Sequence, residues 1–444
     1  MIRRRAASRA RALATTLAAG LALVPVLAAC GPEEVVPESS DDIVLWLVGA
    51  DTGDDLRRHL VETFEARNPG ATLTIEQKEW GTLVDDLEAS LVDPAATPDV
   101  VELGNTQAPT FADAGAFRAI SPALYEELGG EDLLPSFVEA GSVDGTVYAL
   151  PYYFGSRYVF YRKDVWDAAG AEVPRTLEEF GETVKDLRDG NQAGFAMGGQ
   201  DWRNGISWVF AHGGELAVKE GEHWVSTLSD PNTIRGLEEW QDIYESASQL
   251  PATEVDVDYW DFINDGLATG EPAAASMMAP SWARWSVGDI VRDDDGAEVR
   301  DGMADTEKFG IFALPGVDGG VAPVFAGGSN MAVSALTRNV ALSEDLLRVV
   351  YSEEYQTMLA EAGLGPANTE FTELMTGDKF GRTLVKTAEA SKLTPPAPGW
   401  ADIEARGIYE ELFKEIARGG SVPALAQQYD ARITPLLDGT VEEE

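Results

Sequence analysis

Residues 43–67, IVLWLVGADTGDDLRRHLVETFEAR, carry the clearest structural pattern in this chain. The run 43–48 is continuously apolar, which is typical of a strand that is buried on both faces. Within 54–67 apolar residues recur at helical spacing, and an Asn-Pro-Gly stop signal follows at 68–70. The stretch therefore predicts a buried strand followed by an amphipathic helix.

The same alternation continues toward the C-terminus. Residues 73–75 alternate as in a strand, 83–91 have a helical stripe of apolar residues, and 98–103 are a third short apolar run. This β-α-β-α-β order predicts a parallel sheet with right-handed crossovers. Ligands of open α/β sheets bind at the carboxyl ends of the strands. We therefore expect ligand contacts in the loops after Trp46, Trp80 and Leu103.

The rest of the chain predicts a second α/β lobe. Paired extended runs begin near residue 141, and an Asp-Gly turn at 144–145 joins two short strands. A strand is expected at 309–314, and a glycine-rich FAGGSN segment occupies 325–330. Helical patterns are present at 176–188, 231–249, 342–361 and 400–418.

Length and composition narrow the class of protein. The 444 residues suit two or three domains. The 33 basic against 76 acidic residues give a net charge of −43, so nucleic acid and acidic membrane surfaces would be repelled. With 44% apolar residues the composition is globular. The single cysteine, Cys30, excludes an internal disulfide and any CxxC motif.

The N-terminus resembles a lipoprotein export signal. Residues 1–29 combine five arginines with a short apolar run, and a permanent transmembrane helix is the weaker interpretation. The run ends in LAACG at 27–31, which resembles a bacterial lipobox, where cleavage leaves a lipidated Cys30. The alternative is an ordinary signal peptide with an incidental cysteine. Residues 30–41 are predicted to be a flexible tether, and the chain without residues 1–29 would carry a charge of −48.

Six stretches carry a family likeness over the expected mature chain. The stretches are WLVGADTGDDL (46–56), PDVVELGNTQAPTFADAGAFRAI (98–120), ALPYYFGSRYVFYRKDVWDAAG (149–170), SMMAPSWARWSVG (276–288), FAGGSN (325–330) and LTPPAPGWADIEARGIYEEL (393–412). Through these stretches the chain resembles the extracellular solute-binding proteins of ABC importers, in the carbohydrate-binding group that includes maltose-binding protein.

This resemblance implies an α/β, two-lobed periplasmic-binding-protein-like fold, with interleaved chain crossings and a ligand cleft between the lobes. One lobe would hold residues 42–151 and 326–370, and the other 152–325 and 371–444. Hinges would lie near 150–153, 325–328 and Glu370.

The resemblance also implies a function. The chain would be a monomer anchored as a lipoprotein to the outer face of the cell membrane. It would capture a carbohydrate, with a di- or oligosaccharide favoured over a monosaccharide, and deliver it to the permease of an ABC importer.

Sugar rings offer apolar C–H faces and a girdle of hydroxyl groups, so their sites need aromatic platforms and paired polar groups. Trp282 aligns with a family tryptophan that stacks on sugar, and Trp400 matches an aromatic position of the maltose-binding relatives. Asp201 and Trp202 match a ligand-touching segment only if a gap is allowed, and Trp260 is a weaker candidate. The predicted ligand-binding residues are Asp51, Asn105, Gln107, Tyr153, Arg157, Asp201, Trp202, Trp282, Asn330 and Trp400.

Several of these residues have structural alternatives. Asp51 could instead cap the helix at 54–67, and Thr106 or Asn105 could cap a helix that begins near Ala108. For Asn330 a structural role is expected first, and a backbone contact with the ligand is the alternative. Residues 155–157 replace a carboxylate of a relative, which makes maltose itself a doubtful ligand, and Arg157 could pair with a carboxylate of the other lobe.

The alternative function is a secreted glycan-active enzyme that uses a pair of carboxylates. No motif singles out such a pair, and the sequence contains no GxSxG, P-loop, GxGxxG or HExxH pattern. The acidic stretch 256–265 fails as an EF-hand, because Trp260 stands where an oxygen ligand is needed. We therefore expect a binding protein without catalytic residues, cofactor or required metal.

Overall fold

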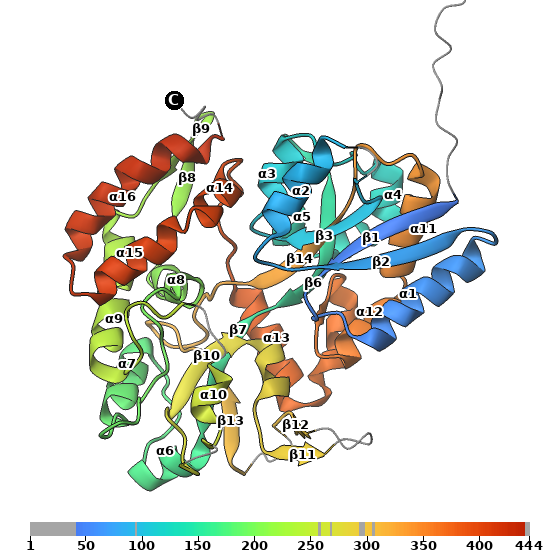
Figure 1. Cartoon of the computed structure of the whole chain (residues 1–444). Helices are drawn as coiled ribbons and strands as arrows, with labels where there is room; N and C mark the ends of the chain where they lie inside the picture. The colour runs from blue at the N-terminus through green and yellow to red at the C-terminus, as the bar shows by residue number, and fades with distance from the viewer. Residues whose placement is uncertain are drawn as a thin grey trace, which may run out of the picture. The chain divides into compact units, whose positions relative to one another are not determined.

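The computed structural model of the chain describes residues 41–93, 96–255, 259–266, 269–292, 298–303 and 307–439 (Figure 1). The predicted signal peptide, Cys30 and almost all of the predicted tether lie outside these residues, and so do Asp256 and Asp258 of the acidic stretch. In the part of the chain that is described, no helix is both long enough and apolar enough to span a membrane.

The first lobe is built on a six-stranded sheet. Strands β1, β2 and β3 are parallel, as the alternating pattern predicts, whereas β14 runs antiparallel to both β3 and β6. In spatial order the strands are β15 (Gly365–Pro366), β6 (Ala149–Gly155), β14 (Gly327–Val333), β3 (Val100–Gly104), β1 (Asp42–Val48) and β2 (Thr72–Lys78).

Alternate residues of β1 pack on opposite faces of this sheet, because side chains of a strand point alternately to its two sides. Leu45 joins the core formed with α1 (Asp54–Arg67), α11 (Val340–Val350) and α12 (Glu353–Glu361). Trp46 joins the core on the other face. That core includes helices α2 (Leu83–Leu91) and α3 (Ala108–Asp113).

Short elements complete this lobe. The hairpin predicted at the Asp-Gly turn is present, with Asp144 and Gly145 both at positive φ, as a tight two-residue turn requires. The elements are α4 (Pro122–Glu127), the 3-10 helix η1 (Gly130–Asp132), α5 (Pro135–Ala140), β4 (Ser142–Val143) and β5 (Thr146–Val147).

The second lobe contains a three-stranded sheet of β10 (Ser276–Pro280), β7 (Arg157–Arg162) and β13 (Phe309–Phe312), flanked by helices and two hairpins (Figure 1). Its helices are α6 (Lys163–Ala169), α7 (Leu177–Asp186), α8 (Trp202–Ala211), α9 (Pro231–Ala247), α10 (Trp260–Ile263), η2 (Ser281–Ser286), α14 (Trp400–Ala405), α15 (Ile408–Ala417) and α16 (Val422–Leu437). The hairpins are β8 (Ala217–Glu220) with β9 (His223–Ser226), and β11 (Ile290–Arg292) with β12 (Glu298–Arg300).

The chain passes between the two sheets more than once. Strand β6 ends in the first sheet at Gly155, and β7 begins in the second at Arg157, so Ser156 is the first crossing. The chain returns between β13 and β14. A third connection runs through η3 (Thr369–Gly377) and α13 (Lys379–Ala390). The predicted hinge positions and lobe boundaries stay predictions.

Two predicted helices are divided in the structure. The pattern at 342–361 forms α11 and α12, because the Ser352 hydroxyl accepts from the amide of Tyr355 at 3.3 Å and caps a new helix. The pattern at 400–418 forms α14 and α15, because Gly407 adopts a left-handed conformation with φ of 63°. One further helix of the described residues, α16, follows α15 in the sequence.

Candidate ligand-binding site

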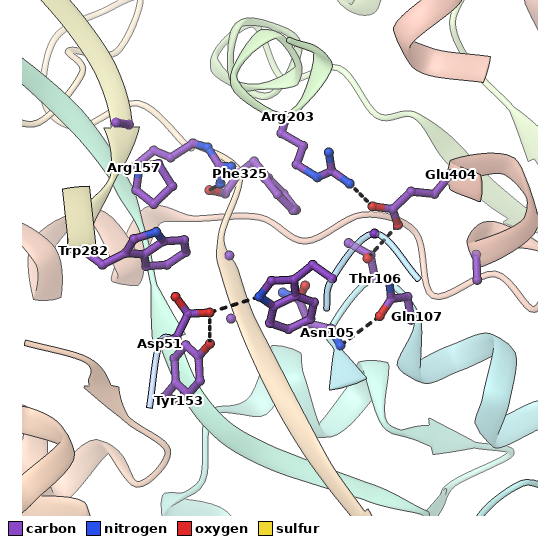
Figure 2. A pocket seen from close by; sticks show the side chains of 18 of the residues that line it. Asp51, Asn105, Thr106, Gln107, Tyr153, Arg157, Arg203, Trp282, Phe325 and Glu404 are labelled. Atoms are coloured by element: carbon purple, nitrogen blue, oxygen red, sulfur yellow. Dashed lines mark hydrogen bonds and ion pairs between the residues drawn. The ribbon is translucent and has the colours of Figure 1, made fainter. Parts of the chain in front are cut away.

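A cavity of about 660 Å³ lies between the two lobes. Its volume is within the range of small-molecule sites, which are usually lined by aromatic groups with a few placed polar groups. Its aromatic lining residues are Trp80, Tyr153, Tyr259, Trp260, Trp282 and Phe325. Its charged and polar lining residues are Asp51, Asp85, Asn105, Thr106, Gln107, Arg157, Arg203 and Glu404, most of which are labelled in Figure 2.

The first lobe contributes loops that follow its parallel strands. Asp51 comes after β1, Trp80 after β2, and residues 105–107 after β3. Strand β1 lies between β2 and β3, so the chain adds β2 on one side of β1 and β3 on the other, and the strand order reverses at β1. Ligand crevices of open α/β sheets form at such a reversal. The cavity therefore lies at the edge of the sheet that the alternating sequence pattern indicates.

The carboxylate of Asp51 is oriented by two donors. The indole Nε1 of Trp80 donates to its Oδ2 at 3.1 Å, and the hydroxyl of Tyr153 donates to the same oxygen at 3.2 Å (Figure 2). Burial raises the pKa of Asp51, while these two bonds and the charge of Arg57 oppose that rise. The N-cap of α1 is Gly53, so Asp51 does not cap that helix.

The two predicted amides are tied to backbone groups at the cavity wall. Asn105 donates from Nδ2 to the carbonyl of Ala326 at 3.1 Å, which links the first lobe to the returning chain. Gln107 accepts at Oε1 from the amide of Gly104 at 3.1 Å. The N-cap residue of α3 is Gln107, without a side-chain capping bond, so Asn105 does not act as the helix cap.

Trp282 and Arg157 enter the cavity from the second lobe and the crossing. The indole of Trp282 packs on Gly155, where the absence of a side chain leaves room for the ring. The guanidinium of Arg157 donates from Nε to Asn204 Oδ1 at 2.9 Å and lies 4.7 Å from the centre of the Phe325 ring. Both side chains are therefore held in place by their neighbours.

Hydrogen bonds join the two lobes beside the cavity. Thr106 donates from its hydroxyl to Glu404 Oε2 at 2.8 Å, and Arg203 forms an ion pair with the other oxygen of Glu404 (Figure 2). Nearby, the hydroxyl of Thr110 accepts from the amide of Ala401 at 3.1 Å. One carboxylate of the second lobe thus contacts both lobes.

The sequence analysis pointed to the loop after Trp80 but did not name Trp80 itself as a ligand-binding residue, and it did not identify Arg203 and Glu404. Trp80 could have been found, because it follows a predicted strand at the ligand-binding edge of the sheet. Arg203 and Glu404 belong to helical segments far apart in the sequence, and no local pattern distinguishes them from other surface charges. Trp260, a weaker candidate from sequence, does line the cavity.

Two predicted residues lie in the aromatic core of the second lobe instead of at the cavity. Trp400 is fully buried, with its ring 5.2 Å from that of Tyr409. Trp202 is 1% exposed, and its indole donates to Glu410 Oε1 at 2.9 Å. Their apolar rings are used in packing helices α8, α14 and α15 together.

Two other predicted residues have structural roles. Asp201 is fully buried and caps α8, since its Oδ1 accepts from the amide of Asn204 at 3.0 Å. Asn330 is fully buried within β14 and donates from Nδ2 to the carbonyl of Phe137 at 2.9 Å. Neither side chain lines the cavity. Within the described part of the chain, no group of three His, Cys, Asp or Glu side chains is placed to hold a metal ion.

Comparison with known proteins assigns the class. Residues 59–382 match the bacterial extracellular solute-binding protein family, and this match covers more than half of the chain. The chain belongs to the bacterial extracellular solute-binding protein family. The family resemblance seen in the sequence is confirmed.

Individual relatives agree with this class. The diacetylchitobiose binding protein DasA of Streptomyces coelicolor is 27% identical over 370 residues, which make up 82% of each chain. The sugar-binding protein MalE of Xanthomonas citri has a TM-score of 0.73 at 21% identity, over 90% of this chain and 98% of MalE.

The GacH receptor of Streptomyces glaucescens, solved unliganded and with acarbose, has a TM-score of 0.73 at 19% identity, over 89% of this chain and 98% of GacH. The two structural matches show the two-lobed fold that was predicted, and the family and these relatives are binding proteins.

Proposed function

We propose that this chain is the substrate-binding subunit of an ABC importer and that it encloses a di- or oligosaccharide between its lobes. The observation that carries this proposal is that Trp80 of the first lobe and Trp282 of the second line one cavity together with the oriented carboxylate of Asp51. Indole faces suit the apolar faces of sugar rings, and a carboxylate accepts hydrogen bonds from hydroxyl groups.

The likeness to DasA supports a choice of first ligands. That relative is named for diacetylchitobiose, and it matches most of the present chain. Chitobiose and diacetylchitobiose therefore belong in a binding panel beside cellobiose, trehalose, maltose and monosaccharides. Asp51, Asn105, Gln107, Tyr153, Arg157 and Trp282 line the cavity, and we propose that they contact the ligand.

Binding would shift the lobes toward a closed arrangement. A ligand that contacts both lobes favours the closed state by its differential affinity for that state. Small-angle scattering should show a smaller radius of gyration when ligand saturates the protein. An unchanged radius would count against closure.

The lipid anchor is part of the same proposal and rests on residues 27–31. A lipidated Cys30 would hold the receptor at the outer face of the membrane beside its permease, and the receptor would act as a monomer. Replacing Cys30 with Ala should release the protein from the membrane fraction, and sedimentation should give a monomer mass. Retention of the Cys30→Ala variant at the membrane would contradict the lipid anchor.

The binding function is tested by thermal shift across the sugar panel. A ligand at about 100 times its Kd stabilises the folded state by about 2.7 kcal/mol. The variant Trp80→Ala should lose most of the shift, whereas Trp285→Ala, which removes a 48% exposed tryptophan outside the cavity lining, should keep it. Chromatography of the incubated sugars distinguishes binding from hydrolysis, since cleavage products would support the enzyme alternative.

A further inference from the structure

Glu102 does not line the cavity, but its carboxyl group connects three strands of the first lobe, β1, β3 and β14. Glu102 is fully buried in β3. Its Oε2 accepts from the amide of Val48 in β1 at 2.8 Å, and its Oε1 accepts from the hydroxyl of Ser329 in β14 at 2.7 Å. One side chain thus bonds to both strands that flank its own.

These bonds fall where the regular ladder ends. The parallel pairing of β1 with β3 reaches only Trp46 and Val101. Beyond that point the two strands are no longer paired with each other, and the Glu102 carboxylate accepts the hydrogen bond of the Val48 amide. An unpaired buried amide would be costly, so this bond stabilises the end of β1 in its observed position.

The three connected strands lead directly into the cavity wall. Val48 is the last residue of β1, and the loop that carries Asp51 follows it. Strand β3 ends two residues after Glu102, at Gly104, and continues into Asn105. In β14, Ser329 is preceded by Gly328, whose carbonyl accepts from the Asn105 amide at 3.2 Å.

We propose that Glu102 is a positioning residue for the ligand-binding loops, and that its charge makes ligand affinity depend on pH. The proposal about affinity rests on the proposed sugar-binding function. The proposal about positioning does not, because it concerns the ligand-free protein.

The groups around Glu102 explain why it can titrate in this range. Burial raises the pKa of Glu102 to about 7, although the bonds from Val48 and Ser329 act in the opposite direction. The negative charge of Asp51 raises it further. The tyrosines that interact electrostatically with Glu102 are neutral in this range, because burial raises their pKa values; they are Tyr152, Tyr153 and Tyr355.

The nearby cation acts mainly on the Asp51 loop. Arg57 donates from Nε to the carbonyl of Thr52 and from Nη2 to that of Gly49, both at 2.7 Å, and its charge favours ionised Asp51. Asp51 and Glu102 are therefore two carboxyl groups that repel each other when both are charged, and Asp51 is the one better supported in its charged form.

Ligand binding should strengthen this repulsion. Sugar hydroxyls that donate to Asp51 stabilise its charge, and closure removes water that screens the two groups. The pKa of Glu102 then rises in the complex, so binding takes up a proton. The affinity should consequently be higher at acidic pH. A rise of about one pH unit in that pKa gives about fivefold tighter binding at pH 6 than at pH 8.

The variant Glu102→Gln separates the effect of the charge from the effect of the hydrogen bonds to Val48 and Ser329. Its amide can still accept from Val48 and can donate to Ser329 Oγ, so the strands stay joined while the titration is lost. Calorimetry should show a pH dependence in the wild type that is absent in Glu102→Gln. The variant Glu102→Leu should bind more weakly at both pH values. An identical pH profile in wild type and Glu102→Gln would overturn the proposal.

A second measurement needs no ligand. Trp80 reports on Asp51 through its hydrogen bond, so the fluorescence difference between wild type and Trp80→Phe should titrate with a midpoint near pH 7. Glu102→Gln should abolish that transition. Glu410→Gln, which removes a partly buried carboxyl of raised pKa in the second lobe, should retain it.

The two arms distinguish the two proposals. A pH transition in the fluorescence of Trp80, without binding of any sugar in the panel, would support the role of Glu102 and contradict the proposed ligand class. No titration in the wild type would contradict the role of Glu102, whatever the protein binds.

Discussion

Trp282 packs so closely on Gly155 that a Cβ atom built on this glycine would lie 2.3 Å from the ring carbon Cζ3. Real Cβ atoms do not approach other atoms so closely, so any larger residue at 155 must move the indole or the backbone. Gly155 ends β6 directly before the chain crosses to the second lobe. The first crossing and an aromatic wall of the cavity therefore depend on each other.

We expect Gly155→Ala to weaken ligand binding by displacing Trp282. Forcing extra volume into a packed region costs about 1–3 kcal/mol, so the melting temperature should also fall. Calorimetry and thermal unfolding measure the two effects. The control is Gly377→Ala, where nothing lies within 4 Å of the added methyl group. A Gly155→Ala protein with wild-type affinity would show that the position of Trp282 is unimportant for the ligand.

The Asp51→Asn variant should bind the ligand more weakly, and its folded state should be more stable. Burial raises the pKa of Asp51, so its charged form is less favourable in the folded protein than in the unfolded chain, and the neutral amide avoids this cost. Hydrogen bonds to charged groups contribute about 1.5–3 kcal/mol, so binding should weaken by about 10- to 150-fold. Denaturant unfolding and calorimetry, each at neutral pH, give the two quantities. A less stable variant with unchanged affinity would contradict both parts.

The Thr106→Val variant should weaken binding through the contact between lobes. It removes the donor that reaches Glu404 Oε2, while the ion pair of Glu404 with Arg203 lies within the second lobe and remains. Losing a hydrogen bond to a carboxylate costs about 1.5–3 kcal/mol, and we expect the loss to appear mainly as faster ligand dissociation. Stopped-flow fluorescence measures this rate. Thr376→Val, on the exposed 3-10 helix η3, is the matched control, and equal rates in both variants would refute the prediction.

Glu102 should also make folding stability depend on pH. Its pKa in the folded protein is about 7, above the ordinary value of 4.5, so between these values the folded state holds a proton that the unfolded chain has released. Stability should consequently fall as the pH rises through this window, by up to about 3 kcal/mol relative to Glu102→Gln. Urea unfolding of both proteins across the window tests this. A constant difference between them would exclude titration of Glu102.

Much of the fold could be predicted from local pattern. The continuous apolar run at 43–48 occurs as β1, and the helical stripe at 54–67 occurs as α1. A strand that is buried on both faces is apolar throughout, whereas a helix that is buried on one face has apolar residues only at every third or fourth position. The breaks within 342–361 and 400–418 were missed, since a capping serine and a left-handed glycine act over only a few residues and hardly change the apolar period.

The candidate site could be predicted only in part. Asp51, Asn105 and Gln107 follow predicted strands, and the order of strands and helices already assigns them to one edge of the sheet. Trp202 and Trp400 could not be distinguished from ligand platforms, because an indole packs equally well on a sugar or on Tyr409. The burial of a tryptophan depends on neighbours that are distant in the sequence.

The amino-acid sequence determined the class of the chain, its alternating strands and helices, and the edge of the sheet at which polar loops gather, since each of these depends on local periodicity or on ordered motifs. Its folding in three dimensions determined which side chains share the cavity. The bridge from Thr106 to Glu404 and the connection of Val48 and Ser329 through Glu102 join residues that are far apart in the chain. Such contacts leave no spacing in the sequence, because they exist only after the strands and lobes have packed.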